Sequence, residues 1–291
     1  APVVTDDVGA LTGALSDGNA TDDTALALSG TLTAPGGTVE VFNGATSLGA
    51  ATVSGDSWSF QAAVSDGESY AFAYKETDAA GNVSALSEKL TINADTGAPT
   101  AASGTGVAAF LKSSGALSVS SAEAGTAYVV KSTVSVAGLS DILSADASEW
   151  NEVALPEAGA AVDLPLLGLK EGSYALYVAD AAGNLSAAAS VPGGALLTVD
   201  DTAPDIDGKT ITATDDSGSV TGALESGASS DDTVLSLSGT VTEGHTIRIY
   251  DGETLLGSAT VSGTSWSYEA AVVDGTAHSF SYSEIDRAGN E

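Results

Sequence analysis

The sequence predicts an all-β protein that consists of three tandem β-sandwich domains. Three observations support this prediction. Apolar residues alternate with polar ones at a period of two, which is typical of half-buried strands. Turn signals recur about every ten residues, the spacing expected of short antiparallel strands. Several motifs also occur twice at a separation of 208 or 209 residues, which indicates tandem domains rather than one large core.

The alternation is clear in the first third of the chain. Val39 and Val41 alternate with polar residues and are followed by Asn43-Gly44, a strong signal for a hairpin turn. Trp58 and Phe60 are two residues apart and would point to the same side of a strand. Alanine is frequent and favours helices in isolation, but turn signals interrupt every Ala-rich stretch. We therefore predict strands, about seven in each domain.

The repetition relates the two outer thirds of the chain. Asp6-Asp7-Val8-Gly9 recurs as Asp215-Asp216-Ser217-Gly218, 209 residues later. The separation then falls to 208 residues, where Trp58 matches Trp266. The middle of the chain shares the motif Asp180-Ala181-Ala182-Gly183-Asn184 and the junctions with these two segments. We interpret the middle segment as a divergent copy.

Two Pro-containing junctions, at residues 95–99 and 200–204, divide the chain into three repeats. We place the first repeat at residues 1–97, the middle repeat at 98–202 and the third repeat at 203–291. The register predicts that the first repeat lacks its opening residues and that the third lacks its last strand. Residues 138–149 of the middle repeat could form a short helix.

A strong negative charge limits the classes of partner. The chain has 39 acidic and 8 basic residues, which give a formal net charge of −31. Nucleic acids and anionic membranes would be repelled by such a surface, so we expect neither as a partner. Because 43% of the residues are hydrophobic, we expect the charge on a folded surface rather than in a disordered chain. Dissolved cations are the partners that this composition favours.

The chain lacks three features that would indicate its cellular environment. It has no cysteine, no apolar run long enough to span a bilayer and no basic start typical of a signal peptide. Without disulfides, the chain is either intracellular or stabilised outside the cell by something else, for which a metal ion is the obvious candidate. We expect no direct membrane insertion and a monomer whose partners are the neighbouring repeats of the same chain.

Residues for catalysis are scarce. Cysteine is absent, and the only two histidines, His245 and His278, do not recur, since Gly37 and Tyr70 stand at the matching positions. The sequence contains no nucleophile elbow, phosphate-binding loop or zinc-ligand spacing. Pairs of carboxylates occur by chance in so acidic a chain. We therefore predict that the protein is not an enzyme.

The acidic residues gather in turns at repeat-related positions, which predicts bound Ca²⁺, a cation that takes about six to eight oxygen ligands. An EF-hand that begins at Asp17 is rejected because its last acid would fall at Leu28. Strand order instead places the doubled acids at the lower end of one repeat and the Asp-x-x-x-Asn turn at the upper end of the next. Single acids often only shape a turn, but adjacent carboxylates repel each other unless a cation neutralises them.

The candidate ligands fall at two junctions and two outer ends. At the first junction they are Asp6, Asp7, Asp22, Asp23, Asp66, Asp95, Asp180 and Asn184. At the second junction they are Asp200, Asp201, Asp205, Asp207, Glu284, Asp286 and Asn290. At the outer ends they are Glu76, Asp78 and Asn82 of the first repeat and Asp215, Asp216, Asp231, Asp232 and Asp274 of the third. The first junction is the better candidate, because the middle repeat offers few acids at its lower end. The middle repeat also departs from the pattern of the other two: it has no doubled Asp pair before its second strand, and Val178 stands where they have Glu76 and Glu284.

The motifs Asp6-Asp7-Val8-Gly9, Ser29-Gly30-Thr31 and Asp78-Ala79-Ala80-Gly81-Asn82 resemble the bacterial Ig-like repeats of giant type I-secreted, RTX-type biofilm adhesins. The resemblance covers the first and third repeats, whereas the middle repeat departs from it. It implies Ig-like sandwiches and an extracellular location at the bacterial cell surface. It also implies that the repeats are extenders, which project a distal ligand-binding domain for attachment and biofilm formation, with Ca²⁺ stiffening the junctions.

The alternative function is a carbohydrate- or protein-binding module centred on the middle repeat. It would use the divergent middle repeat and Trp150, which has no counterpart in the other repeats and could stack on a sugar ring. Trp58 and Trp266 do recur and are expected in the cores. Packing is also the role that we favour for Trp150.

Overall fold

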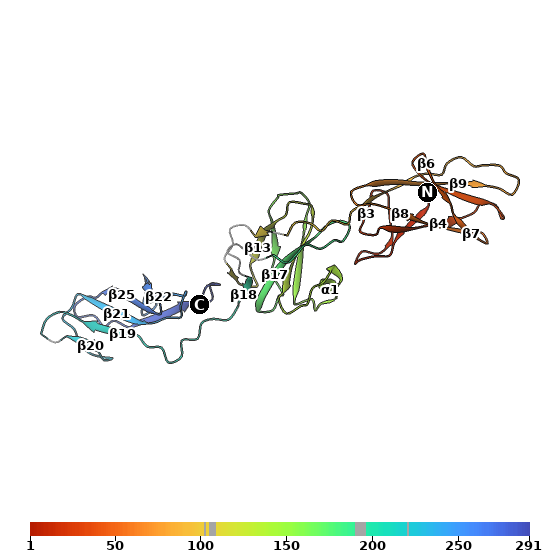
Figure 1. Cartoon of the computed structure of the whole chain (residues 1–291). Helices are drawn as coiled ribbons and strands as arrows, with labels where there is room; N and C mark the ends of the chain where they lie inside the picture. The colour runs from red at the N-terminus through yellow and green to blue at the C-terminus, as the bar shows by residue number, and fades with distance from the viewer. Residues whose placement is uncertain (102, 105–108, 190–195, 220) are drawn as a thin grey trace. The chain divides into compact units, whose positions relative to one another are not determined.

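In the computed structural model, the described residues are 1–101, 103–104, 109–189, 196–219 and 221–291 (Figure 1). Their strands form antiparallel and mixed sheets, with one short helix among them, so the predicted all-β fold of tandem β-sandwiches is confirmed. By their contacts the residues group into two compact units. Unit 1 comprises residues 1–109 and 114–197, and unit 2 comprises residues 110–113 and 198–291. The repeat boundaries near residues 97 and 202 remain predictions.

The first repeat, in unit 1, is a sandwich of two five-stranded sheets. The strand orders are β2-β1-β4-β8-β7 and β3-β10-β9-β5-β6. Figure 1 shows β4 and β8 in one layer and β9 in the other. The strands are β1 (Val3–Asp6), β2 (Gly13–Ala14), β3 (Ala20–Thr21), β4 (Ala25–Thr31), β5 (Thr38–Asn43), β6 (Thr46–Ala50), β7 (Thr52–Ser54), β8 (Ser57–Ala63), β9 (Ser69–Thr77) and β10 (Leu90–Ala94).

The strands are shorter and more numerous than the seven predicted, because the chain crosses between the two sheets within what the sequence presents as single strands. β6 and β7 lie on either side of Ala51, and β6 pairs with β5 in one sheet while β7 pairs with β8 in the other. Likewise, β2 extends the edge next to β1, and β3 pairs in parallel with β10 of the opposite sheet. The alternation of apolar residues does not reveal such crossings.

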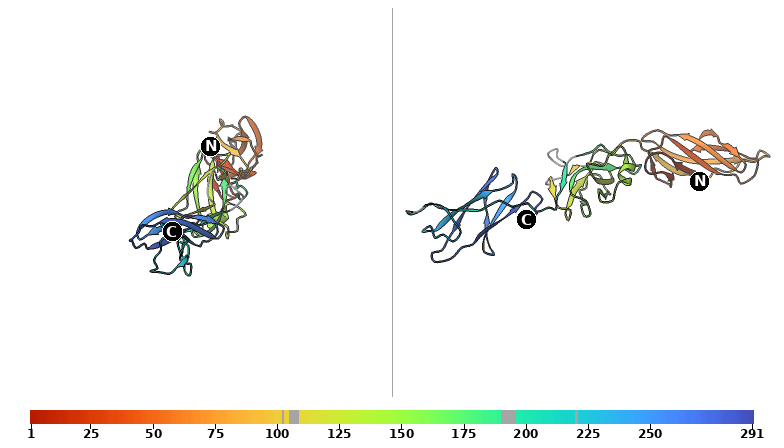
Figure 2. Two further views of the ribbon diagram at one scale, coloured as in Figure 1. Left: turned by 90° about the vertical axis from the view of Figure 1, so that its left-hand side faces the viewer. Right: turned by 90° about the horizontal axis from the view of Figure 1, so that it is seen from below.

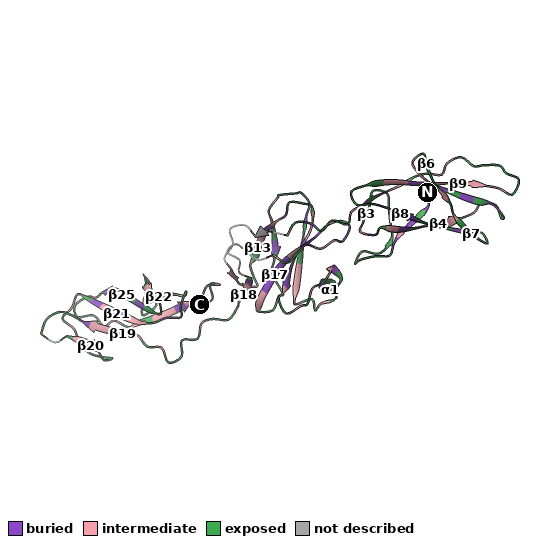
Figure 3. Cartoon of the chain, in the orientation of Figure 1, coloured by how far each residue is buried: buried purple, intermediate pink, exposed green. Residues whose placement is uncertain are grey.

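The predicted alternation does appear in the burial of the core. Leu26, Leu28 and Val41 are at most 1% exposed, and Trp58 is 2% exposed, while their strand neighbours are exposed or half-buried. Figure 3 shows buried segments interspersed with exposed and intermediate ones along these strands. Burying each aliphatic side chain of this kind stabilises the fold by about 1.5–3 kcal/mol. The repeated Ser-Gly-Thr motif has a packing role, because a Cβ on Gly30 would lie 2.7 Å from the indole nitrogen of Trp58.

The part of the middle repeat in unit 1 holds two groups of strands and the helix. β14 (Gly125–Lys131) pairs with β15 (Trp150–Leu155) and β17 (Gly172–Ala179). β13 (Ala116–Ser120) pairs with β16 (Val162–Pro165) and with β11 (Ser103–Gly104). The predicted short helix is confirmed as α1 (Leu139–Ser144).

The helix belongs to a satellite core of the middle repeat. It buries Leu139 and Ile142, which form a cluster with Tyr128, Val130 and Ala179. Its first turn is fixed by the Asp141 carboxylate, which accepts a hydrogen bond from the amide of Gly138 at 3.0 Å. Ala10 of the first repeat packs against this cluster. The apolar contact joins the loop after β1 to the middle repeat within unit 1.

Unit 2 contains the third repeat and a short piece of the middle one. Its sheets have the orders β20-β19-β21-β25-β24 and β23-β22-β26. Figure 2 shows the third repeat in teal to blue. β12 (Phe110–Leu111) runs parallel to β18 (Leu197–Val199). The remaining strands are β19 (Thr212–Asp215), β20 (Gly222–Leu224), β21 (Val234–Thr240), β22 (Thr246–Asp251), β23 (Thr254–Ser258), β24 (Thr260–Ser262), β25 (Ser265–Ala271) and β26 (Phe280–Ile285).

The core of the third repeat repeats that of the first. Trp266 is 2% exposed and lies against the backbone of Gly239, where a Cβ would meet the indole ring at 2.8 Å. Of the helical residues that the structure describes, none belongs to a helix with the length and apolar character needed to cross a membrane.

Candidate functional site

The end of the first repeat at which β1 finishes is its lower end. This end is organised around Asp6, the last residue of β1. Asp6 is only 2% exposed. One carboxylate oxygen accepts a hydrogen bond from the amide of Val8 at 2.9 Å, and the other accepts one from the hydroxyl of Thr21 at 2.5 Å. The Thr21 hydroxyl in turn accepts a hydrogen bond from the amide of Asp23 at 3.2 Å. These bonds fix the Asp22-Asp23 pair beside the end of β1.

Two carboxylate oxygens of this pair have no hydrogen-bond donor. Oδ1 of Asp22 and Oδ2 of Asp23 are buried and unpartnered, and Asp23 as a whole is 2% exposed. Burying a charged oxygen without a hydrogen-bond donor is costly, so these two atoms are available to a cation or to a water molecule. The repeated Asp-Asp-x-Gly motif is explained here as well. Gly9 has a φ of 71°, and a Cβ on it would lie 2.2 Å from Oδ2 of Asp22.

The linker and the middle repeat complete the first junction. The carboxylate of Asp66 accepts a hydrogen bond from the amide of Thr96 at 2.7 Å. The side-chain amide of Asn184 donates to the backbone oxygen of Asp95 and to Oδ2 of Asp180, both at 2.9 Å. The Asp180–Asn184 turn therefore holds the linker where the first and middle repeats meet in unit 1.

The electrostatics of this junction are repulsive. Burial raises the pKa of Asp22, and the nearby charges of Asp6, Asp23 and Asp180 raise it further. Burial likewise raises the pKa of Asp95, with added repulsion from Asp180, Asp66 and Glu123. In the part of the chain that the structure describes, no lysine, arginine or histidine forms an ion pair with these acids. The junction therefore lacks a cation of its own.

The site is not a finished metal cage. Among the described residues, no three histidine, aspartate or glutamate side chains are already arranged to hold a metal ion. Asp7, which was predicted with the others, is exposed. A divalent cation would therefore draw on backbone carbonyls and water as well as on carboxylates, as Ca²⁺ commonly does.

The lower end of the third repeat has the same construction. Asp215 accepts hydrogen bonds from the amide of Ser217 at 3.1 Å and from the hydroxyl of Ser230 at 2.7 Å. One difference is that Oδ2 of Asp232 accepts a bond from the amide of Asp216 at 3.0 Å. A pocket lies beside this group, and its lining consists of Asp215, Ser219, Ser229, Ser230 and Asp231. Asp274, the last candidate at this end, is exposed.

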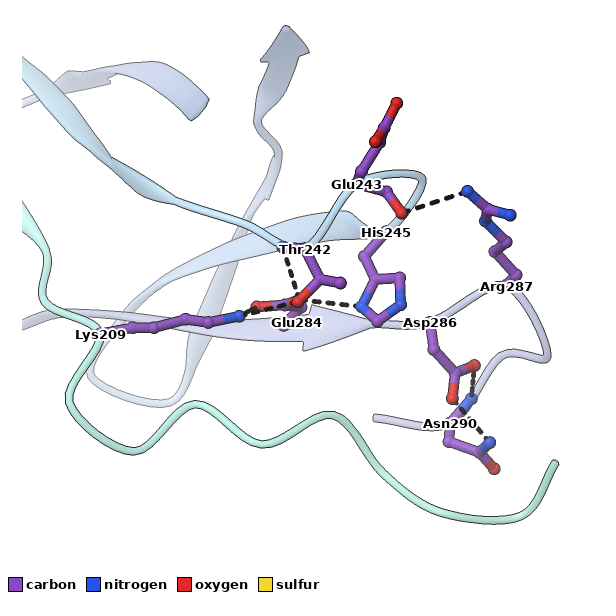
Figure 4. A network of polar contacts seen from close by, with 8 residues as sticks. All are labelled: Lys209, Thr242, Glu243, His245, Glu284, Asp286, Arg287 and Asn290. Atoms are coloured by element: carbon purple, nitrogen blue, oxygen red, sulfur yellow. Dashed lines mark hydrogen bonds and ion pairs between the residues drawn. The ribbon is translucent and has the colours of Figure 1, made fainter. Parts of the chain in front are cut away.

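The upper end of the third repeat carries a polar network that sequence patterns did not reveal (Figure 4). Glu284 is 2% exposed, and its carboxylate contacts Nζ of Lys209 at 2.5 Å and Nδ1 of His245 at 2.8 Å. It also accepts a hydrogen bond from the amide of Thr242 at 3.0 Å. Burial opposes ionisation, but these bonds hold the pKa of Glu284 below its ordinary value. Glu284 therefore already has a cationic partner.

The turn that follows Glu284 repeats the clamp of the first junction. Asn290 donates from its side chain to Oδ2 of Asp286 at 2.8 Å and to the backbone oxygen of Asp200 at 2.9 Å. Asp201 accepts a hydrogen bond from the amide of Ser113 at 2.9 Å. Asp205 and Asp207, two further candidates, form a local turn in which Asp205 accepts a hydrogen bond from the amide of Asp207 at 2.9 Å.

The upper end of the first repeat has a pocket beside its own turn. Glu76 accepts hydrogen bonds from the amide and hydroxyl of Thr33, at 3.0 and 2.5 Å. Asp78 accepts two bonds from Asn82, at 2.8 Å each, which lower its pKa. These residues line the pocket together with Leu32, Thr33, Gly37 and Ser84.

The contacts of His278 and Trp150 are with neighbouring residues of their own repeats. Nδ1 of His278 contacts Asp251 at 2.7 Å, and its Nε2 accepts a hydrogen bond from the amide of Val273 at 3.0 Å, so both ring nitrogens are engaged. Trp150 packs on Tyr128, with the ring centroids 5.9 Å apart. These contacts favour structural roles.

One family model agrees with the fold of the first repeat. The family model described as "Bacterial Ig-like domain" matches residues 1–96. The fibronectin(III)-like modules of Clostridium thermocellum CbhA are similar at 13% identity and a TM-score of 0.40, over 67% of this chain and 93% of that one.

Two other solved structures are less similar. The first is Bacteroides ovatus SGBP-B of the mixed-linkage glucan utilization locus, in complex with a mixed-linkage heptasaccharide (13% identity, TM-score 0.24, 98% of this chain and 65% of that one). The second is the BSP domain of a biofilm associated protein (11% identity, TM-score 0.21, 98% and 63%). No curated protein matches the chain. At these scores, no function follows from the structural likeness.

Proposed function

We propose that the chain is a structural extender segment of a large bacterial surface adhesin of the RTX type. Its repeats would project a distal ligand-binding domain from the cell for attachment and biofilm formation. The tandem sandwiches and the Ig-like match of the first repeat support an architectural role. The chain would act outside the cell as a monomer, with its neighbouring repeats as its partners, and it would perform no catalysis.

The proposal includes Ca²⁺ as the ion that stiffens the first junction. The observation that carries it is the pair of buried, unpartnered oxygens on Asp22 and Asp23. The charge of Asp180, from the middle repeat, adds to the repulsion on Asp22. A cation between these groups would turn that repulsion into an attraction that links the two repeats.

The residues suited to hold the ion are those whose charges meet here. Asp22 and Asp23 would offer their free oxygens, and Asp6, Asp95 and Asp180 would add negative charge around them. When bound, Ca²⁺ supplies positive charge and binds several oxygens at once. Asp66 and Asn184 have a positioning role, since they fix the linker by hydrogen bonds to Thr96 and Asp95. Asp215 and Asp231 would serve the same purpose at the lower end of the third repeat.

Calorimetric titration with Ca²⁺, followed by thermal unfolding, tests the proposal. A ligand that binds only the folded state raises the melting temperature by mass action. We expect a clear rise in millimolar Ca²⁺ relative to EDTA, and a smaller one in Mg²⁺, which demands a compact octahedral shell. Asp22→Asn with Asp23→Asn should remove part of the bound Ca²⁺. Asp56→Asn, on the exposed β7–β8 turn, is the matched control. Equal melting curves in Ca²⁺ and EDTA would contradict the proposal.

A further inference from the structure

The two junctions share one backbone arrangement. At the first junction, the amide of Asp95 donates to the backbone oxygen of Thr21 at 2.9 Å. In unit 2, the amide of Asp200 donates to the backbone oxygen of Leu111 at 3.0 Å, in the same kind of parallel strand pair. Thr21 and Leu111 are therefore equivalent positions, although the sequence around them is unrelated.

The residues that follow Thr21 and Leu111 carry opposite charges. Asp22 follows Thr21, and Lys112 follows Leu111. Where the first junction has a carboxylate with an unpartnered oxygen, the second junction thus has an ammonium group. Lys112 also faces the turn of the third repeat, because its Cε lies 3.9 Å from the position that a Cβ on Gly289 would take.

A second cation lies in that same turn. Arg287 stands where the first and middle repeats have Ala79 and Ala181. Its guanidinium carbon lies 5.3 Å from the ring centroid of Phe110, and it donates a hydrogen bond to the backbone oxygen of Glu243 at 3.3 Å. A guanidinium above an aromatic face is attracted to the ring without any metal.

The asparagine clamp is alike at the two junctions. Asn184 and Asn290 donate to the backbone oxygens of Asp95 and Asp200, each at 2.9 Å. The junctions differ in their charges. The second has Lys112 and Arg287, two of only eight lysines and arginines in the chain, while no cationic side chain pairs with the acids of the first among the described residues.

We propose that Lys112 and Arg287 stabilise the second junction in place of a divalent cation, so that this junction stays ordered, or closed, without metal. Only the first junction then responds to Ca²⁺, and the second stays closed when Ca²⁺ is removed. The difference in Ca²⁺ response between the two junctions rests on the proposed function, because that function assigns Ca²⁺ to the first junction. The role of Lys112 and Arg287 at the second junction does not rest on it. Such a segment has one conditional hinge and one permanent contact, so removing Ca²⁺ loosens it at a defined place.

Distance measurements between spin labels test each junction separately. The chain has no cysteine, so labels go only where cysteines are introduced. Ser59, Ala154 and Ser267 are exposed strand residues of the three repeats. The pair Ser59→Cys with Ala154→Cys reports on the first junction, and Ala154→Cys with Ser267→Cys reports on the second. In EDTA, we expect the first distance distribution to broaden severalfold and the second to keep its Ca²⁺ width.

Variants test the two cations directly. Arg287→Ala combined with Lys112→Asp should broaden the second distribution in EDTA and leave the first unchanged. Phe110→Leu keeps the apolar volume but removes the aromatic face, and it should produce a smaller broadening. The matched control is Lys75→Ala, which removes a cation that lies 5.3 Å from the Phe42 ring within the first repeat. It should change neither distribution.

The outcomes separate the two proposals. If the second distribution of the unmodified chain broadens in EDTA as the first does, or if Arg287→Ala with Lys112→Asp leaves it narrow, the inference is overturned. If the first distribution ignores EDTA while the second depends on the two cations, the calcium proposal fails and the role of Lys112 and Arg287 stands. A folded near-ultraviolet circular dichroism spectrum of each variant is required for either conclusion.

Discussion

The side-chain amide of Asn184 donates a hydrogen bond to the backbone oxygen of Asp95 at 2.9 Å, and so joins the middle repeat to the linker that precedes it. The same nitrogen contacts Oδ2 of Asp180 at 2.9 Å. The asparagine of the Asp-x-Ala-Gly-Asn motif therefore acts first as a donor, which leaves its own oxygen for a cation or water. A backbone carbonyl is a partner that any linker sequence provides, so this clamp tolerates variation in the linker.

Replacing Asn184 should weaken the first junction in the absence of metal. Asn184→Ala removes two hydrogen bonds, one of them to an ionised group, so we expect a loss of about 2 kcal/mol in the free energy of unfolding. Chemical denaturation in EDTA measures it. Asn82→Ala is the matched control, because the described contacts of its side chain are with Asp78 of its own turn. It should lose about half as much, and equal losses would show that Asn184 contributes nothing across the junction.

The effect of Asp22→Asn should change sign with Ca²⁺. In EDTA, the substitution removes a charge that burial and three neighbouring acids make unfavourable, so the variant should be the more stable protein. In millimolar Ca²⁺, the variant loses a charged ligand and should be the less stable one. Thermal unfolding in the two buffers measures both differences. Asp56→Asn changes the same charge on an exposed turn and should show no reversal.

The periodicity and repetition of the sequence were sufficient to predict the all-β sandwiches and the core tryptophans, whereas residues 138–149 were recognised only as a stretch that could form a short helix. Trp58 and Trp266 are easily predicted because a buried aromatic recurs at a fixed separation. The crossing of the chain between sheets at Ala51 was not predicted, because alternation is the same in either sheet. The residues of the candidate site were named from repeated acids, but a pattern of acids does not say which oxygens lack a donor.

The cations at the second junction could not be predicted for a different reason. Lys112 is equivalent to Asp22 only through the strand register, since no residues around it match the first repeat. Lys209 and Glu284 are 75 residues apart in the chain, and nothing local connects them. The composition contained a useful clue. Because lysine and arginine are rare in this chain, each of them is a candidate partner for a buried or clustered acid.

Removing the partner of a buried carboxylate should cost far more than removing an exposed ion pair. Lys209→Ala leaves Glu284 buried with His245 and Thr242 alone, and we expect a loss of about 2–3 kcal/mol. Lys170→Ala is the control, because Lys170 and Asp146 are 55% and 63% exposed and lie 3.6 Å apart. Its loss should be much smaller, because both side chains are exposed to solvent. Urea denaturation compares the two, and similar losses would mean that Glu284 is satisfied without Lys209.

The free energy of unfolding should depend on pH in part through the titration of Asp22. Its folded-state pKa is raised above the ordinary value, so the folded chain binds this proton more tightly than the unfolded chain. The resulting stabilisation is full below the unfolded pKa and is lost as pH rises through the folded pKa. Glu284 and Asp286 have lowered pKa values and act in the opposite direction, because their contributions are lost as pH falls.

The difference in stability between the unmodified chain and Asp22→Asn removes these other groups from the comparison. In EDTA, the unmodified chain should gain stability relative to Asp22→Asn as the pH falls from about 7 to about 4, because Asp22 becomes neutral. In Ca²⁺ the trend should reverse, since the proton competes with the metal for the same oxygens and the ion leaves as the carboxylates are protonated. Unfolding in urea at a series of pH values gives both curves. A difference that stays flat with pH in both buffers would mean that Asp22 is not held among like charges, and the cation site would lose its physical basis.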